Sequence, residues 1–192
     1  MTSNGLSEKP VGVIGAGSFG TVIANMLAET RQVLLYTRDP QKAEQIRKAG
    51  KIKGVSLHSN ISITTELSEV ANHCDIIFPI LPSAVFRSTI REISPYLRPY
   101  HILIHGTKGL DVQLPEGETL ESMRYLDRTM VKTMSEVIQE ESVVVRVGCL
   151  AGPNLSRELA ERQPGATVIA SPFQEVINTG KKLLRNERFQ VY

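Results

Sequence analysis

The sequence predicts an α/β protein with a doubly wound, mostly parallel sheet and helices on both faces. Short apolar runs alternate with longer amphipathic segments along most of the 192 residues, as in successive βαβ units. One run, residues 75–81 (DIIFPIL), is almost entirely apolar, which is typical of a strand buried on both faces of a parallel sheet. Right-handed crossovers then place helices on both sides of the sheet.

The first half of the chain supplies strands and helices in regular order. The β-branched run Val11–Ile14 predicts the first strand, and a helix over 21–29 places Val22 and Leu27 on one face. Pro79 is unusual within the strand over 75–81, because proline cannot donate to a ladder. The other expected elements are strands over 32–36, 61–65 (at an edge) and 101–105, and helices over 40–49, 67–73 and 84–97, while residues 51–60 show little pattern.

The second half continues the alternation after a long polar stretch. Its pattern predicts a long helix over 118–139, followed by strands over 143–150, 167–170 and 189–192 and helices over 155–162 and 174–185. No segment rich in Pro, Gly and Ser divides the chain, so we expect one domain over 10–192. Residues 1–9 are polar and are expected to form a disordered tail.

A glycine-rich turn joins the first strand to the first helix. Gly15, Gly17 and Gly20 follow the G-x-G-x-x-G pattern, with Ser18 and Phe19 between the last two glycines. The first glycine permits a tight turn, the second lets a diphosphate approach the backbone, and the third allows close packing of helix on strand. The N–H groups at the helix start then favour the phosphate charge. We therefore predict a dinucleotide site, the alternative being a glycine-rich turn with no ligand.

The end of the second strand bears on which dinucleotide is bound. An acidic residue there would accept hydrogen bonds from the ribose 2′-hydroxyl of NAD, but this chain has Thr37 followed by Arg38. An arginine at this place can pair with the 2′-phosphate of NADP, which gives NADP a modest preference over NAD. Asp39 keeps the NAD interpretation open, although it can equally cap the helix that begins at Pro40.

Two further turns follow strands whose carboxyl ends face the ligand crevice of a doubly wound sheet. Pro82 and Ser83 could line the nicotinamide ribose, or Ser83 could only cap the next helix. Lys108 stands between Thr107 and Gly109 after the strand over 101–105, where it could bind a substrate phosphate or polarise a carbonyl. The alternative for Lys108 is an ordinary solvated loop lysine.

The strand over 143–150 leads into a third turn of this kind. Gly152 and Pro153 turn the chain, and Asn154 is placed to cap the helix that follows. The start of that helix would again face the crevice, but a simple capped helix with no ligand is an equally good interpretation on local grounds.

Composition excludes several other classes of function. The formal net charge of +2, the 5% aromatic content and the absence of tryptophan argue against a nucleic-acid partner. No apolar run approaches the roughly 18–20 residues needed to span a bilayer, so we expect no membrane partner. Two distant cysteines, Cys74 and Cys149, fit a reducing cytoplasm, and the histidines lack the spacing of a metal site.

Taken together, five stretches resemble the N-terminal, Rossmann-type domain of the NAD(P)-dependent glycerol-3-phosphate dehydrogenase family. They are VGVIGAGSFGTVIANMLAE, LLYTRDP, DIIFPILPSAVFRSTI, HGTKGLD and AGPNLSRELAER. The glycine pattern is common to many dehydrogenases, whereas T-K-G after one strand and G-P-N after the next are far more specific. The resemblance implies reduction of dihydroxyacetone phosphate by NAD(P)H to sn-glycerol 3-phosphate, the precursor of glycerophospholipids.

The resemblance also implies roles for individual residues. Ser18, Phe19 and Arg38 would contact the cofactor, as would Ser156, which replaces the small residue often found there. Lys108 would meet both cofactor and substrate and act as the catalytic residue of this domain. Gly152 and Asn154 would approach the substrate. Residues 112–124 form a longer segment than the family pattern leads us to expect.

The family's main general acid/base is a lysine of a second, helical substrate domain, which we expect to be absent from these 192 residues. The chain by itself is therefore predicted to bind dinucleotide and to be inactive, and the full-length protein is expected to be a homodimer. Two alternatives stay open at this point. One is a related dehydrogenase that acts on a hydroxy acid or sugar acid. The other is a non-catalytic NAD(P)-binding sensor module.

Overall fold

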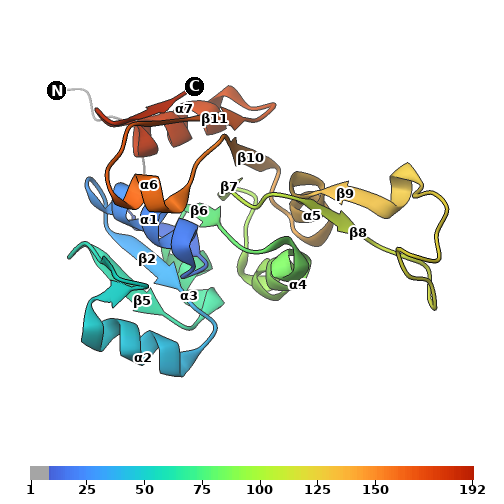
Figure 1. Cartoon of the computed structure of the whole chain (residues 1–192), viewed down its shortest axis with the longest axis horizontal. Helices are drawn as coiled ribbons and strands as arrows, with labels where there is room; N and C mark the ends of the chain where they lie inside the picture. Colours follow the sequence, from blue (N-terminus) through green and yellow to red (C-terminus); the bar gives the residue numbers. More distant parts are fainter. Residues whose placement is uncertain (1–8) are drawn as a thin grey trace.

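The computed structural model describes residues 9–192, and within this range eight strands form a single sheet (Figure 1). Their order is β12–β11–β10–β7–β6–β1–β2–β5. Every neighbouring pair is parallel except β10 and β11, which confirms the predicted mostly parallel sheet and the edge position of the strand over 61–65. The strands are β1 (Val11–Ile14), β2 (Val33–Tyr36), β5 (Ile61–Thr64), β6 (Ile76–Pro79), β7 (Ile102–His105), β10 (Arg146–Ala151), β11 (Gly165–Ala170) and β12 (Phe189–Val191).

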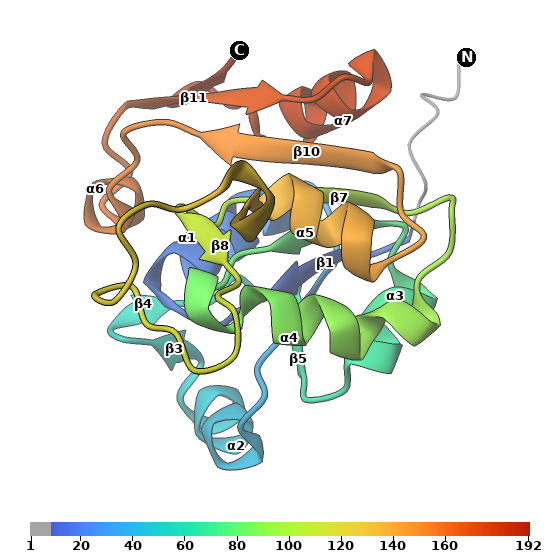
Figure 2. The same cartoon turned by 90° about the vertical axis from the view of Figure 1, so that its right-hand side faces the viewer.

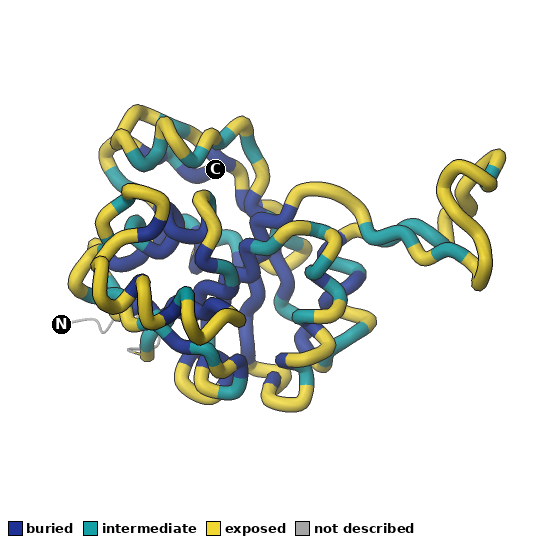
Figure 3. Tube along the Cα trace, turned by 60° about the horizontal axis from the view of Figure 1, so that its bottom comes forward, coloured by how far each residue is buried: buried dark blue, intermediate teal, exposed yellow. Residues whose placement is uncertain are grey.

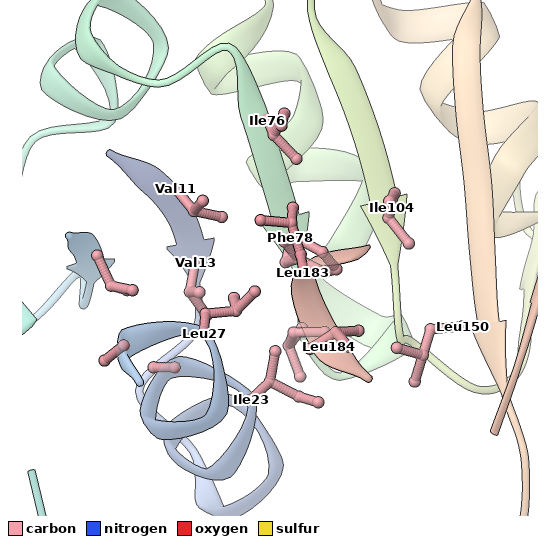
Figure 4. Packing of buried hydrophobic residues seen from close by; sticks show 14 of the residues in the cluster. Val11, Val13, Ile23, Leu27, Ile76, Phe78, Ile104, Leu150, Leu183 and Leu184 are labelled. Carbon is pink, nitrogen blue, oxygen red and sulfur yellow. The ribbon is translucent and has the colours of Figure 1, made fainter. Parts of the chain in front are cut away.

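Helices cover both faces of the sheet, as predicted (Figures 1 and 2). Successive strand residues point to opposite faces, so Ile76 and Phe78 pack with α1 and α7, whereas Ile77 packs with α3, α4 and α5. Figure 4 shows the first of these clusters around Phe78 and Leu27. The helices are α1 (Ser18–Ala28), α2 (Pro40–Ala49), α3 (Leu67–His73), α4 (Ser83–Ile93), α5 (Met134–Glu141), α6 (Ser156–Ala160) and α7 (Gln174–Leu184), with short 3-10 turns η1 (Ser94–Tyr96) and η2 (Arg128–Met130).

The predicted helix over 118–139 is wrong. Strands β8 (Leu110–Val112) and β9 (Val131–Thr133) pair antiparallel and carry residues 113–130 out from the sheet as a projecting arm (Figures 1 and 3). Leu120 and Leu126 of the arm are exposed, so a helix there would have no core surface to pack against. The helix begins only at Met134, where Thr133 and Glu136 form a capping box.

Two local features explain the other irregularities of the sequence. Pro79 is the last residue of β6, beyond the register pairs of β6 with β7, and its carbonyl oxygen still accepts from the Gly106 N–H at 3.1 Å, so the strand end stays bonded although proline donates nothing. Residues 51–60, which show little pattern, contain a small hairpin of β3 (Lys51–Ile52) and β4 (Val55–Ser56). Ile52 anchors this hairpin in the core beside α1.

The expected tail over 1–9 lies outside the described residues except for Lys9, whose Nζ is 2.8 Å from Asp75 Oδ1. Among the residues that the structure describes, no helix combines the length and apolarity that crossing a membrane requires.

Candidate functional site

Two glycines of the turn between β1 and α1 are required by the fold itself. Gly15 has φ +122°, and a Cβ there would lie 2.2 Å from the carbonyl oxygen of Ile80. A Cβ on Gly20 would lie 1.9 Å from the carbonyl oxygen of Gly15. Because both obstacles are backbone atoms, the helix can approach the strand this closely only when the two residues are glycine.

Gly17 differs from its neighbours because the fold does not require it. Its φ of −90° and ψ of −176° are ordinary for any residue, and a Cβ there would meet no atom within 4 Å. Gly17 is the N-cap of α1, so the N–H groups of Ser18 and Phe19 have no acceptor within the helix. An open backbone with free donors at a helix start is suited to a phosphate group, and the turn therefore fits the diphosphate of a dinucleotide.

The ends of β6 and β7 meet beside this turn. The backbone N–H of Leu81 donates to Thr107 Oγ1 at 3.2 Å, which ties the two strand ends together. The Phe19 ring packs on Gly106, where a Cβ would lie 3.2 Å from Phe19 Cε1. Pro82 is exposed at the N-cap of α4 with no side-chain cap hydrogen bond, so the alternative of a cap by Ser83 is not what the structure shows.

Lys108 joins two of the motifs. It is exposed just beyond β7, and its Nζ donates to the carbonyl oxygen of Gly152 at 3.1 Å. This contact links T-K-G to G-P-N across 44 residues of sequence. No carboxylate of residues 9–192 forms an ion pair with Lys108, so its charge is available to an anionic ligand.

Asn154 does not cap the following helix. Its Nδ2 donates to Thr167 Oγ1 at 3.0 Å, and Thr167 in turn donates to the carbonyl oxygen of Ala151 at 3.0 Å. The N-cap of α6 is Leu155, with no side-chain cap hydrogen bond. The capping interpretation is therefore wrong, because the amide is turned toward buried Thr167 on β11, which holds the G-P-N turn in place.

The remaining candidate residues, Ser156, Arg38 and Asp39, lie near the turns described above. Ser156 begins α6 and, with Ser18, lines a cavity of about 1030 Å³ between α1, the β3–β4 hairpin, α6 and residues 186–189. Arg38 is exposed after β2 and makes no hydrogen bond or ion pair with the described residues. Asp39 caps α2 by accepting from the N–H groups of Gln41 at 2.9 Å and Lys42 at 3.1 Å, which confirms its capping role.

His105, at the end of β7, is buried beneath this edge. Its Nε2 lies 2.9 Å from Ser135 Oγ, and its ring packs edge-on against Phe86. Its Nδ1 has no hydrogen-bond partner in the described part of the chain. Burial lowers the pKa of the imidazole to about 4, so His105 is neutral at neutral pH. Because the side chain is buried and its Nε2 contacts Ser135, the structure gives His105 no access to a ligand as a base.

Sequence reasoning missed four side chains that shape the site. Thr107 and Thr167 act through contacts with residues distant in sequence, for which no local signal exists. Lys42 and Lys53 reach the glycine-rich turn, donating to the Ala16 carbonyl oxygen at 2.9 Å and to Ser18 Oγ at 3.3 Å. Only Gly54, a residue typical of tight turns, could have indicated that Lys53 stands at a hairpin tip.

A doubly wound sheet with this glycine-rich turn at the carboxyl end of β1 defines a Rossmann-type dinucleotide-binding domain. Comparison with known families narrows the class. Residues 10–177 match the profile described as the N-terminus of NAD-dependent glycerol-3-phosphate dehydrogenase, and the chain belongs to this family.

Individual relatives agree with this assignment. A glycerol-3-phosphate dehydrogenase [NAD(P)+] of Ectopseudomonas mendocina is 36% identical over 189 residues, covering 96% of this chain and 51% of that protein. One from Azotobacter vinelandii is 34% identical and covers 97% of this chain and 52% of that protein. A crystal structure of the Coxiella burnetii glycerol-3-phosphate dehydrogenase shares the fold, with a TM-score of 0.79, 24% identity, and coverage of 96% and 53%. The chain spans about half the length of the relatives it matches.

Proposed function

We propose that this chain is the dinucleotide-binding part of an NAD(P)-dependent glycerol-3-phosphate dehydrogenase. The full reaction would transfer a hydride between NAD(P)H and dihydroxyacetone phosphate, giving sn-glycerol 3-phosphate for glycerophospholipid synthesis. The observation that carries the proposal is the contact of Lys108 with Gly152, which brings the two most specific motifs together at the crevice. The names of the relatives support the same reaction, and they argue against a hydroxy-acid or sugar-acid substrate.

The cofactor would lie along the carboxyl edge of the sheet. In this proposal the turn of Gly15, Gly17 and Gly20 and the N–H groups of Ser18 and Phe19 hold the diphosphate. Arg38 lies beyond the end of β2, where its free guanidinium would pair with the 2′-phosphate of NADP.

The nicotinamide end would lie beside the strand ends that carry the other motifs. Pro82, the N-cap of α4, would line that end, and Ser156, the first residue of α6, would contact the cofactor. When bound, the cofactor supplies the hydride.

Lys108 would be the catalytic residue of this part of the protein. Its ammonium group would hold positive charge against the substrate oxygen that gains negative charge during reduction. Gly152 presents its carbonyl to Lys108 Nζ and so orients the ammonium group. Asn154, held by Thr167, would position the substrate on the opposite side of the turn.

A cofactor titration tests the binding half of the proposal. We expect the 192-residue chain to bind NADPH and NADH, measured by the change in reduced-nicotinamide fluorescence, with NADPH bound more tightly. Arg38→Ala should weaken NADPH binding by roughly tenfold or more, the equivalent of one charge-assisted contact, and leave NADH binding nearly unchanged. Arg38 would be removed from the site if the parent chain bound both cofactors with equal affinity. The same would follow if Arg38→Ala weakened NADPH and NADH binding by the same factor.

Two further proposals concern the activity of these 192 residues alone and the assembly of the full-length protein. We expect the chain by itself not to reduce dihydroxyacetone phosphate measurably, since its family resemblance places the main acid/base in a second domain. A clear initial rate of NADPH oxidation with this substrate would overturn that expectation. We also propose that the full-length protein is a cytoplasmic homodimer, which sedimentation of that protein would test.

A further inference from the structure

Two lysines with no acidic partner meet the glycine-rich turn. Lys53 Nζ donates to Ser18 Oγ at 3.3 Å, and Lys42 Nζ donates to the Ala16 carbonyl oxygen at 2.9 Å. Neither forms an ion pair within residues 9–192. By contrast, Arg47 and Lys48 on α2 both pair with Glu44. Two positive charges without an acidic partner therefore lie at the turn, where they favour an anion.

The two lysines occupy different positions relative to the turn. Lys42 is half-buried and donates to a backbone oxygen of the turn, so it stabilises the turn's conformation. Lys53 is exposed and bonds a side-chain hydroxyl on the first residue of α1. Only Lys53 also lines the cavity that Ser18 and Ser156 border. Lys53 is thus the lysine with free access to a ligand.

The β3–β4 hairpin fixes where Lys53 can reach. Lys53 and Gly54 form its two-residue turn with φ of 47° and 84°, so both adopt the left-handed conformation. Asn25 of α1 ties the hairpin to the helix, because its Nδ2 donates to the Ser56 carbonyl oxygen at 2.9 Å and its Oδ1 accepts from the His58 N–H at 2.9 Å. The hairpin tip therefore stays beside the start of α1.

We propose that Lys53 is an additional binding residue for the diphosphate of the cofactor, reaching it from the hairpin across the glycine-rich turn. This inference rests on the proposed function. The diphosphate is favoured over the 2′-phosphate because Ser18 supplies one of the free N–H groups at the helix start, whereas Arg38 lies at the end of β2. A lysine there adds a charge-assisted hydrogen bond to those of the backbone.

The test compares two lysines of the same hairpin. Lys53→Met should weaken the binding of NADH and of NADPH by the same factor, roughly tenfold, because both carry the diphosphate. Lys53→Arg should restore most of the affinity. Lys51→Met is the matched control, since Lys51 is exposed on β3 but neither contacts the turn nor lines the cavity, and it should leave both affinities unchanged. Thermal unfolding followed by circular dichroism checks that the variants fold equally.

The outcomes separate the inference from the proposed function. Unchanged affinity of Lys53→Met for both cofactors, with tight binding by the parent chain, would overturn the inference alone. Loss of NADPH binding only would overturn the diphosphate assignment in favour of the 2′-phosphate. Failure of the parent chain to bind either cofactor would overturn the proposed function and the inference with it.

Discussion

Gly17 and Gly20 belong to one motif, but alanine at the two positions should do different things. A methyl group on Gly20 would lie 1.9 Å from the Gly15 carbonyl oxygen, where ordinary contacts start at 3.4 Å. A methyl group on Gly17 would meet nothing within 4 Å. The first substitution therefore forces α1 away from β1, whereas the second leaves the protein itself undisturbed.

The expected magnitudes follow from these distances. Overpacking costs about 1–3 kcal/mol, and because the obstacle at Gly20 is backbone we expect Gly20→Ala to lose about 2–3 kcal/mol of unfolding free energy. For a chain of this size that lowers Tm by about 5–10 °C. Gly17→Ala loses only the difference between glycine and alanine at an N-cap, about 1 kcal/mol or less. Its effect should instead be on cofactor affinity, which we expect to fall more than tenfold.

Unfolding in urea, followed by circular dichroism, measures the first quantity, and fluorescence titration with NADPH measures the second. Gly20→Ala should be destabilised clearly more than Gly17→Ala. Gly17→Ala should be nearly as stable as the parent chain and bind poorly. If Gly17→Ala binds NADPH like the parent, the diphosphate does not approach this backbone. If Gly20→Ala is as stable as the parent, the close approach of helix to strand is not what requires glycine there.

Three other outcomes follow from contacts near the site. Arg87, whose side chain is 14% exposed, pairs with Asp111 of β8 and with Glu140 and Glu141 of α5. Arg87→Met leaves Asp111 without an ion-pair partner, whereas Glu140 keeps Lys132 and Glu141 keeps Arg91. We expect a loss of about 2–3 kcal/mol of unfolding free energy in urea, and a loss below about 1 kcal/mol would show that the network is dispensable. The hydrogen bond from Arg91 lowers the pKa of Glu141 to about 2. The ionised Glu141 therefore stabilises the fold above about pH 4.5, and this stabilisation is lost as the pH falls toward 2. In Glu141→Gln the unfolding free energy should fall less steeply with acid, and a pH profile like that of the parent chain would contradict this. Thr167→Val removes the acceptor of the Asn154 amide. In the full-length protein it should weaken substrate binding and leave NADPH binding unchanged. A loss of NADPH binding would contradict this.

Elements bounded by local signals could be predicted closely. The helix over 40–49 has the same bounds in the structure, because Asp39 caps its start, Pro40 fits its first turn and Gly50 ends it in the left-handed conformation. The central strands β1, β6 and β7 could be predicted because their apolar runs are buried on both faces. Each of these signals depends only on neighbours in sequence.

The arm could not be predicted in this way. Residues 118–139 carry apolar side chains at spacings compatible with a helix, but helical stability comes mainly from a packed face, and only the part from Met134 onward reaches the core. The capping box of Thr133 and Glu136 was a readable sign of where the helix starts. No local signal in the sequence indicates that β8 pairs with β9, and this pairing closes the arm at its base.

That pairing explains how a long projecting arm can coexist with an ordered site. The arm leaves and rejoins the domain at Leu110 and Thr133, which are partners in the β8–β9 register, so its length does not alter the distance between its ends. Arg87 anchors this base through Asp111, three residues after Lys108. The position of Lys108 therefore depends on the closed base and not on the 18 residues between β8 and β9. A motif search identifies Lys108, but its contact with Gly152 depends on pairings between residues that are distant in sequence.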